Sequence, residues 1–125
     1  MVARLALLLF LAPICAPPQD DEMGEARKFK ILYAGQTGDD REDRFVKLLR
    51  ERFDKVDSIS LQKLSAEAAN GYDVVVADWG RRYKGKGFSA DKAPRAKLSP
   101  NFSRPIVMIG AVAGEIQHWS KINWL

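Results

Sequence analysis

A run of three valines inside the stretch Asp73–Gly80, DVVVADWG, constrains the fold more than any other part of the chain. The run follows an Asn-Gly pair, which favours a turn, and it is left through a glycine. Its apolar residues do not alternate with polar ones, which is typical of a strand buried on both faces. Such strands belong to parallel sheets that helices cover from either side. We therefore expect a central parallel strand here.

Strand and helix patterns alternate on both sides of this run. A cluster of acids suits the positive end of a helix dipole, and Phe45, Leu48, Leu49 and Phe53 follow it on one helical stripe. Strands are expected at 29–34, 56–61, 73–79 and 105–109, and helical segments at 39–53, 65–69 and 115–122. This alternation indicates right-handed βαβ units. The expected fold class is therefore α/β, with a doubly wound, mostly parallel sheet.

The expected sheet has about four strands, whereas doubly wound sheets usually continue further. A fourth strand at the edge would be an apolar strand with unpaired backbone groups, which favours aggregation. We therefore expect an incomplete domain or a fragment, with a minimal four-stranded domain as the alternative. Residues 80–104 are too long for a plain connector, and the helix expected between the last two strands is either missing or lies within them.

The amino terminus has the layout of a secretory signal peptide over residues 1–16. A positively charged start precedes an apolar block too short to span a bilayer, and Ala16 suits cleavage. Residues 17–27 are acidic and contain proline, which predicts a disordered spacer before a domain at 28–125. We expect an exported protein, periplasmic or secreted, with no membrane span after cleavage. An uncleaved anchor is the alternative.

Cysteine and histidine usage limits the chemistry. The single cysteine, Cys15, falls inside the predicted signal, so the mature chain would have no disulfide and no thiol nucleophile. The single histidine, His118, and scattered carboxylates form no metal-ligand pattern. We expect His118 to pack or to lie at the surface. The sequence therefore predicts no catalytic residue and no metal site.

The net charge of +4 is unevenly distributed. Residues 17–80 hold ten Lys and Arg against fourteen Asp and Glu, a balance of −4. Residues 81–104 hold eight Lys and Arg against one Asp, a balance of +7. This basic loop is able to dock on an anionic partner through electrostatic attraction. For an exported chain, the expected partner is an anionic surface or a polysaccharide and not a nucleic acid.

Ligands of open α/β sheets bind outside the carboxyl ends of the strands. One candidate loop there, Gln36, Thr37 and Gly38, resembles the phosphate loop of flavodoxins. It departs from that pattern at Asp39 and Asp40, which would repel a phosphate. A tight turn capped by acids is therefore the alternative to an FMN site, and our main expectation is that no cofactor binds.

A second candidate site directly follows the valine run and contains Asp78, Trp79, Arg81 and Arg82. Trp79 can stack against a ring, and the guanidinium groups are forked donors that suit an anionic or sugar-like ligand. In the structural alternative, Trp79 only covers the core and the arginines are solvated.

The first strand with its glycine exit, the segment YDVVVADWG, and the segment RPIVMIGAVAG followed by INWL resemble a known family. They are similar to the N-terminal half of class I glutamine amidotransferase-like domains, and among these to exported trehalose-utilisation (ThuA-like) proteins. The resemblance covers roughly residues 28–125 and implies a flavodoxin-like three-layer sandwich. The family's nucleophilic cysteine has no counterpart, because its elbow position at Gly110–Gly114 reads GAVAG.

Together these features predict an exported, non-catalytic amidotransferase-like domain that binds a small, carbohydrate-like ligand. Two alternatives stay open. The first is a flavodoxin-like flavin-binding protein that uses Gln36–Gly38, with Trp79 stacked on the flavin ring. The second is an interaction module that docks on anionic surfaces through the basic loop at 80–104.

Overall fold

The computed structural model describes residues 20–80, 82–84, 87–89 and 93–121. Its elements are α1 (Asp20–Arg27), β1 (Lys30–Gly35), α2 (Asp40–Arg50), β2 (Lys55–Ser60), the 3-10 helix η1 (Leu61–Lys63), β3 (Val74–Trp79), β4 (Arg82–Lys84), β5 (Gly87–Ser89), β6 (Ile106–Gly110) and α3 (Val112–Ser120). The predicted signal peptide at 1–16 lies outside the described residues. Within the described ranges, no helix has the length and apolar character needed to cross a membrane.

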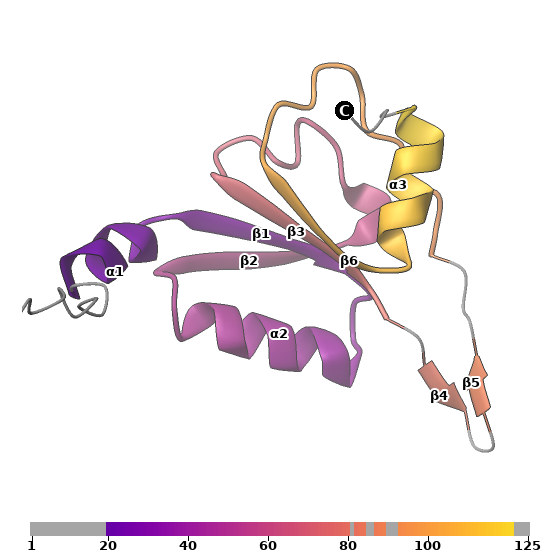
Figure 1. Ribbon diagram of the computed structural model, residues 1–125, viewed down its shortest axis with the longest axis horizontal. Helices are drawn as coiled ribbons and strands as arrows, with labels where there is room; N and C mark the ends of the chain where they lie inside the picture. The colour runs from indigo at the N-terminus through magenta and orange to yellow at the C-terminus, as the bar shows by residue number, and fades with distance from the viewer. Residues whose placement is uncertain (1–19, 81, 85–86, 90–92, 122–125) are drawn as a thin grey trace, which may run out of the picture.

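Helix α1 occupies most of the segment that was expected to be a disordered spacer. It precedes β1, beyond the amino end of the sheet (Figure 1). Arg27 in its last turn complements the helix dipole. The Lys28 side chain also donates a 2.6 Å hydrogen bond to Glu25 at the helix end. Asp20–Arg27 is therefore helical, in a segment for which the sequence predicts a disordered spacer.

The four longer strands form one parallel sheet in the order β2-β1-β3-β6. Val75 of β3 lies opposite Leu32 of β1 on one side and Ile106 of β6 on the other. This order confirms the predicted doubly wound α/β class and is consistent with the flavodoxin-like fold. After β2 the chain returns past β1 to form β3, so the topological switch point lies between β1 and β3.

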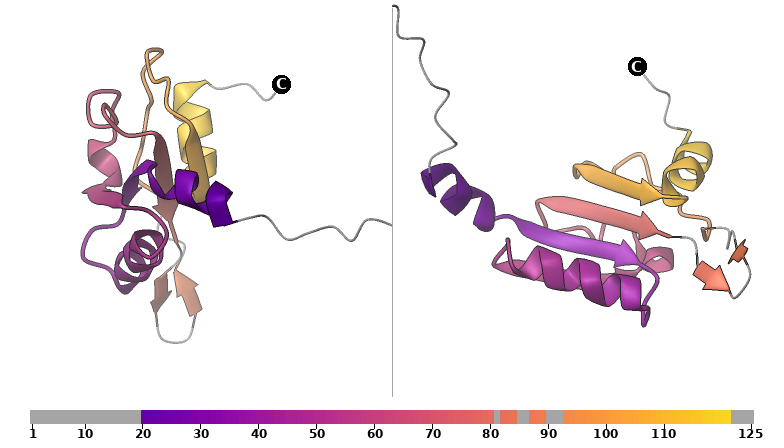
Figure 2. Two further views of the ribbon diagram at one scale, coloured as in Figure 1. Left: turned by 90° about the vertical axis from the view of Figure 1, so that its left-hand side faces the viewer. Right: turned by 60° about the horizontal axis from the view of Figure 1, so that its bottom comes forward.

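Helix α2 covers one face of the sheet, over β1 and β2 (Figure 2). Asp39 caps its start by accepting a 3.1 Å hydrogen bond from the backbone N–H of Arg41. Val46 is buried against the sheet, and Phe45, Leu49 and Phe53 are partly buried around it. Leu48 was expected in this stripe but is 51% exposed, because it lies about 200° around the helix from Val46.

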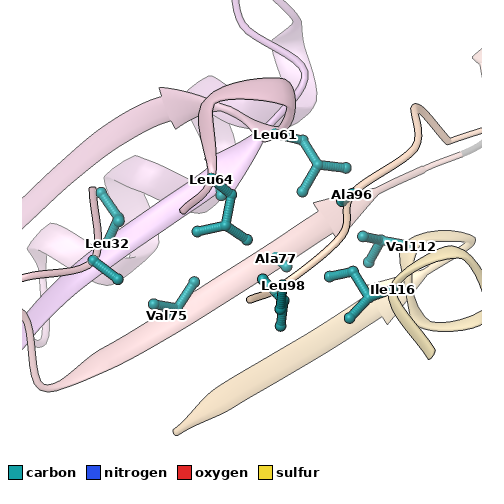
Figure 3. Packing of buried hydrophobic residues seen from close by; sticks show 11 residues of the cluster. Leu32, Leu61, Leu64, Val75, Ala77, Ala96, Leu98, Val112 and Ile116 are labelled. Carbon is teal, nitrogen blue, oxygen red and sulfur yellow. The ribbon is translucent and has the colours of Figure 1, made fainter. Parts of the chain in front are cut away.

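The opposite face of the sheet is covered by α3 and by two segments without α-helix. Leu61 and Leu64 follow β2, Ala96 and Leu98 precede β6, and all four pack into one cluster with Ile116 of α3 (Figure 3). The short helix predicted at 65–69 is a series of hydrogen-bonded turns over residues 66–71. Apolar side chains at these positions cover the sheet without needing a regular helix.

Strand β3 is buried on both faces, as the valine run predicts. Val75 and Ala77 are 0% exposed and belong to the cluster beneath α3. Val76 is buried in the other cluster, beneath α2. The strand therefore lies at the centre of both hydrophobic layers.

The connection at 80–104 contains a short antiparallel hairpin formed by β4 and β5, in which Tyr83 lies opposite Phe88. The hairpin projects from the carboxyl end of the sheet (Figure 1). Among the described residues of this connection there is no α-helix, so the crossover from β3 to β6 differs from a regular βαβ unit.

Helix α3 begins at Val112, inside the stretch expected to be a turn of small residues at 110–114. Gly110 makes this early start possible because its φ is 74°, and a Cβ there would lie 2.5 Å from the carbonyl oxygen of Trp79. The N–H of Ala111 then donates to that oxygen at 3.0 Å. The predicted helix at 115–122 therefore starts three residues too late.

Candidate functional site

The carboxyl ends of β1 and β3 lie side by side at the switch point of the sheet. This is where open α/β sheets bind their ligands. Register pairs join the last residues of both strands, with Ala34 opposite Ala77. The loop at 36–39 leaves β1 here, and Asp78 and Trp79 end β3 at the same edge. The described parts of the two sequence-predicted sites, the loop at 36–38 and the end of β3 at Asp78 and Trp79, therefore lie at the same edge of the sheet.

A buried carboxylate, Asp78, lies at the centre of this edge and is 1% exposed. Arg41 of α2 binds it through two parallel hydrogen bonds, Nε to Oδ2 at 2.7 Å and Nη2 to Oδ1 at 2.8 Å. The Tyr33 hydroxyl donates a third hydrogen bond to Oδ2 at 2.8 Å. The paired geometry makes this a strong, charge-assisted contact. We call these three residues the Asp78 cluster.

Arg41 is the member of the Asp78 cluster that reaches solvent, with 41% of its side chain exposed. Its guanidinium carbon also lies 5.0 Å from the centre of the Phe45 ring, in a cation–π arrangement. Gly80 permits this position, because a Cβ there would lie 2.7 Å from Cδ and Nε of Arg41. The structure thus holds one half-exposed guanidinium in a fixed orientation at the ligand edge.

The environment of Tyr33 raises the pKa of its hydroxyl above the ordinary value of 10.0. Burial is the main cause, followed by the hydrogen bond to Asp78 and repulsion from that carboxylate. The pKa of Arg41 is also raised, chiefly by its hydrogen bond with Asp78. Both shifts keep the cluster in one protonation state, in which Tyr33 is neutral and Arg41 is charged.

The raised pKa of Tyr33 predicts a loss of stability in alkali. The folded chain holds the hydroxyl proton more tightly than the unfolded chain, so this stability is complete below about pH 10 and is lost as the pH rises toward the folded-state pKa. One proton corresponds to a slope of about 1.4 kcal/mol per pH unit. Urea unfolding above pH 10 should show that the wild type loses stability more steeply than Tyr33→Phe, by about this slope. Equal slopes would contradict it.

The loop Gln36–Gly38 is closed by carboxylates of its own chain. The N–H of Gly38 donates to the Glu42 side chain at 2.6 Å, and Glu42 also accepts from the hydroxyl of Ser58. Asp39 accepts from the N–H of Arg41. Gly38 has a φ of 77°, as a tight turn before a helix requires. This geometry favours the capped turn over a phosphate loop, whose N–H groups would point at the ligand.

The remaining predicted site residues are placed as follows. Trp79 is partly buried and packs against the α3 cluster, and its indole N–H is buried without a hydrogen-bond partner among the described residues. Arg82 begins β4, whereas Arg81 lies outside the described residues. Trp79 therefore contributes to the core, on the face of β3 away from Arg41.

The described part of the chain contains no candidate metal site. No group of three or more His, Cys, Asp or Glu side chains gathers there as metal ligands would. His118 is exposed and lies edge-on to Trp119, at 4.9 Å between ring centres. Its position on α3 is thus a surface packing position.

Sequence reasoning identified Asp78 but missed Arg41 and Tyr33, its two partners. Arg41 stands among the acids at the start of α2, where it looks like an ordinary surface charge, and it is 37 residues from Asp78. One signal was available: a charged residue closing an otherwise apolar buried strand needs a partner. An arginine in the first turn of the helix after β1 is within reach of the adjacent strand end.

Comparison with known proteins returned no matching family model, no matching curated protein and no matching solved structure. The resemblance to amidotransferase-like domains therefore stays a prediction.

Proposed function

We propose that this chain is an exported, non-catalytic α/β domain that binds a small polyhydroxylated ligand of the carbohydrate class. The ligand would lie outside the carboxyl ends of β1 and β3, against Arg41 and the exposed loop residues Thr37 and Gly38. The observation that carries the proposal is the half-exposed guanidinium of Arg41, held by the buried Asp78 at the switch point of the sheet.

The Asp78 cluster is better suited to orienting a ligand-binding group than to stabilising the fold. A buried ion pair often contributes no more stability than well-packed apolar side chains of the same volume. It does fix the direction of the N–H groups that Arg41 presents to solvent. Donors that are oriented before binding lose less conformational entropy when a ligand arrives. In this reading Asp78 and Tyr33 are positioning residues, and Arg41 touches the ligand.

The charges around Arg41 favour a ligand with hydroxyl groups over one with a phosphate. Asp39 and Asp40 lie at the start of α2, and Glu42 already occupies the N–H of Gly38. Like charges and the loss of that donor disfavour an anion at this loop. Hydroxyl groups, in contrast, can donate to carboxylates and accept from a guanidinium. A carbohydrate is therefore better matched than FMN.

The absence of a nucleophile supports a binding role over an amidotransferase reaction. The turn from β6 into α3 has the strand-to-helix geometry that a nucleophile elbow needs, with Gly110 at positive φ. The residues there are Gly, Ala, Val, Ala and Gly, none of which has a reactive side chain. This elbow therefore supplies no nucleophile for acyl transfer.

Calorimetric titration with a panel of neutral mono- and disaccharides tests the proposal. We expect Arg41→Lys to bind the best of these sugars about tenfold more weakly, a loss of about 1.4 kcal/mol, because a lysine cannot reproduce the forked donor. Arg44→Lys is the matched control: it is exposed on the same helix and should bind like the wild type. No binding by the wild type, or an equal loss in both variants, would contradict the proposal.

A further inference from the structure

Strand β6 ends the sheet on the side away from β2, and its outer edge pairs with no other described strand. Val75 N–H donates to the carbonyl of Pro105, and Ala111 N–H donates to the carbonyl of Trp79. Odd-numbered residues of this segment therefore turn their backbone groups toward β3. Because hydrogen-bonding direction alternates along a strand, Ile106, Met108 and Gly110 present three N–H and three C=O groups outward.

The two edges of the sheet differ in chemistry. The edge strand β2 carries Lys55, Asp57 and two serines, which resist pairing with another strand. The edge strand β6 reads IVMIG and has no charged residue. Val107 lies on the α2 face of β6, beyond the cover of that helix, and is 50% exposed. An uncharged apolar edge without these protections is a template for a further strand.

We propose that β6 pairs with β6 of a second copy of this chain, antiparallel and around a two-fold axis. In the matching register, Met108 lies opposite the partner's Met108, and Ile106 lies opposite the partner's Gly110. Directly opposed residues of this kind exchange both of their backbone hydrogen bonds. All six outward groups of each strand are then satisfied, and two four-stranded sheets become one continuous sheet.

The same register is favourable for the side chains. Val107 lies opposite the partner's Ile109, in a pair without backbone hydrogen bonds, where side chains approach most closely. Both residues point to the α2 face, so four apolar side chains gather near the two-fold axis. The half-exposed surface of Val107 is thereby covered.

The charges flanking β6 are complementary in this arrangement. The exposed Arg104 precedes β6, and Glu115 lies in the first turn of α3, which follows β6. Antiparallel pairing places the amino end of one β6 beside the carboxyl end of the other. Arg104 of each copy therefore approaches the region of the partner's Glu115, and the two-fold axis repeats this contact. A second copy thus fits both the apolar edge and its charged ends.

Light scattering on the full chain over a concentration series tests the dimer. The wild type should reach twice the mass of one chain, and Val107→Lys should stay at the mass of one chain, because it places two cations near the axis. Phe29→Lys is the matched control: Phe29 is 49% exposed ahead of β1, and this variant should still dimerise. A wild type of single-chain mass at every concentration, or a dimer unaffected by Val107→Lys, would overturn the proposal.

Disulfide trapping in the full chain, with Cys15→Ser to remove the native thiol, tests the register. Met108→Cys should form a covalent dimer on mild oxidation, because opposed residues in a hydrogen-bonded pair have Cα atoms about 5.5 Å apart, within disulfide range. Ile106→Cys should stay unlinked, since it would face the partner's Gly110. Linking through both positions equally, or through neither, would rule out this pairing.

Discussion

The substitution Val75→Asp is expected to abolish the cooperative unfolding transition and to leave the chain unfolded at room temperature. Val75 is 0% exposed on β3, which pairs with β1 on one side and β6 on the other. Figure 3 shows its side chain within the cluster that contains Leu32 and Leu98. An unpaired carboxylate there costs several kcal/mol, whereas a whole domain is stable by about 5–15 kcal/mol. Thermal melting followed by circular dichroism measures the effect.

Two variants separate burial of the charge from other changes. Val75→Ile keeps the site apolar and adds one methylene, so it should retain a cooperative transition. Val107→Asp places the same carboxylate on a valine that is half exposed within one chain, so each chain should stay folded even where pairing through β6 is lost. If Val75→Asp instead melted within a degree or so of the wild type, the central buried strand would be wrong.

The sequence predicts the elements of this fold correctly where the local residue pattern matches the burial of the element. The valine run of β3 has no polar alternation because both of its faces are covered, and this is a local signal. The capped start of α2 is equally local, since Asp39 satisfies an N–H only two residues away. Such features need no knowledge of the rest of the chain.

Other features depend on neighbours that the sequence does not reveal. Leu48 fits a helical stripe, but it is 51% exposed, because it lies about 200° around α2 from the buried Val46. Val112 begins α3 because Gly110 brings the backbone close to Trp79, although GAVAG resembles a turn. In both cases the outcome is decided by packing between elements and not by propensity.

The candidate site shows the same division. Its location followed from the rule that ligands of parallel sheets bind at the carboxyl ends of the strands. Its central contact did not, because Arg41 and Asp78 are far apart in sequence and each has a plausible surface role by itself. Asp78 is buried, and both of its carboxylate oxygens accept hydrogen bonds from Arg41. In the structure it therefore orients the Arg41 side chain.

The substitution Arg41→Met is expected to lower the free energy of unfolding by about 3 kcal/mol. It leaves the carboxylate of Asp78 buried, with the Tyr33 hydroxyl as its remaining hydrogen-bond partner in the cluster. Breaking a buried pair in this way typically costs 3–5 kcal/mol, and the lower end applies because Arg41 is itself half exposed. Urea unfolding at neutral pH measures the loss.

Asp78→Asn supplies the control, because it removes the charge but retains an oxygen that accepts from Tyr33. In this variant the Arg41 side chain can move into solvent, so the free energy of unfolding should fall by only about 1–2 kcal/mol. The double variant Arg41→Met with Asp78→Asn should then be more stable than Arg41→Met alone, since no buried charge is left without a cation. Additive losses in this cycle would mean that the two side chains act independently. Arg41 would then be an ordinary surface residue, and its fixed orientation could not support ligand binding.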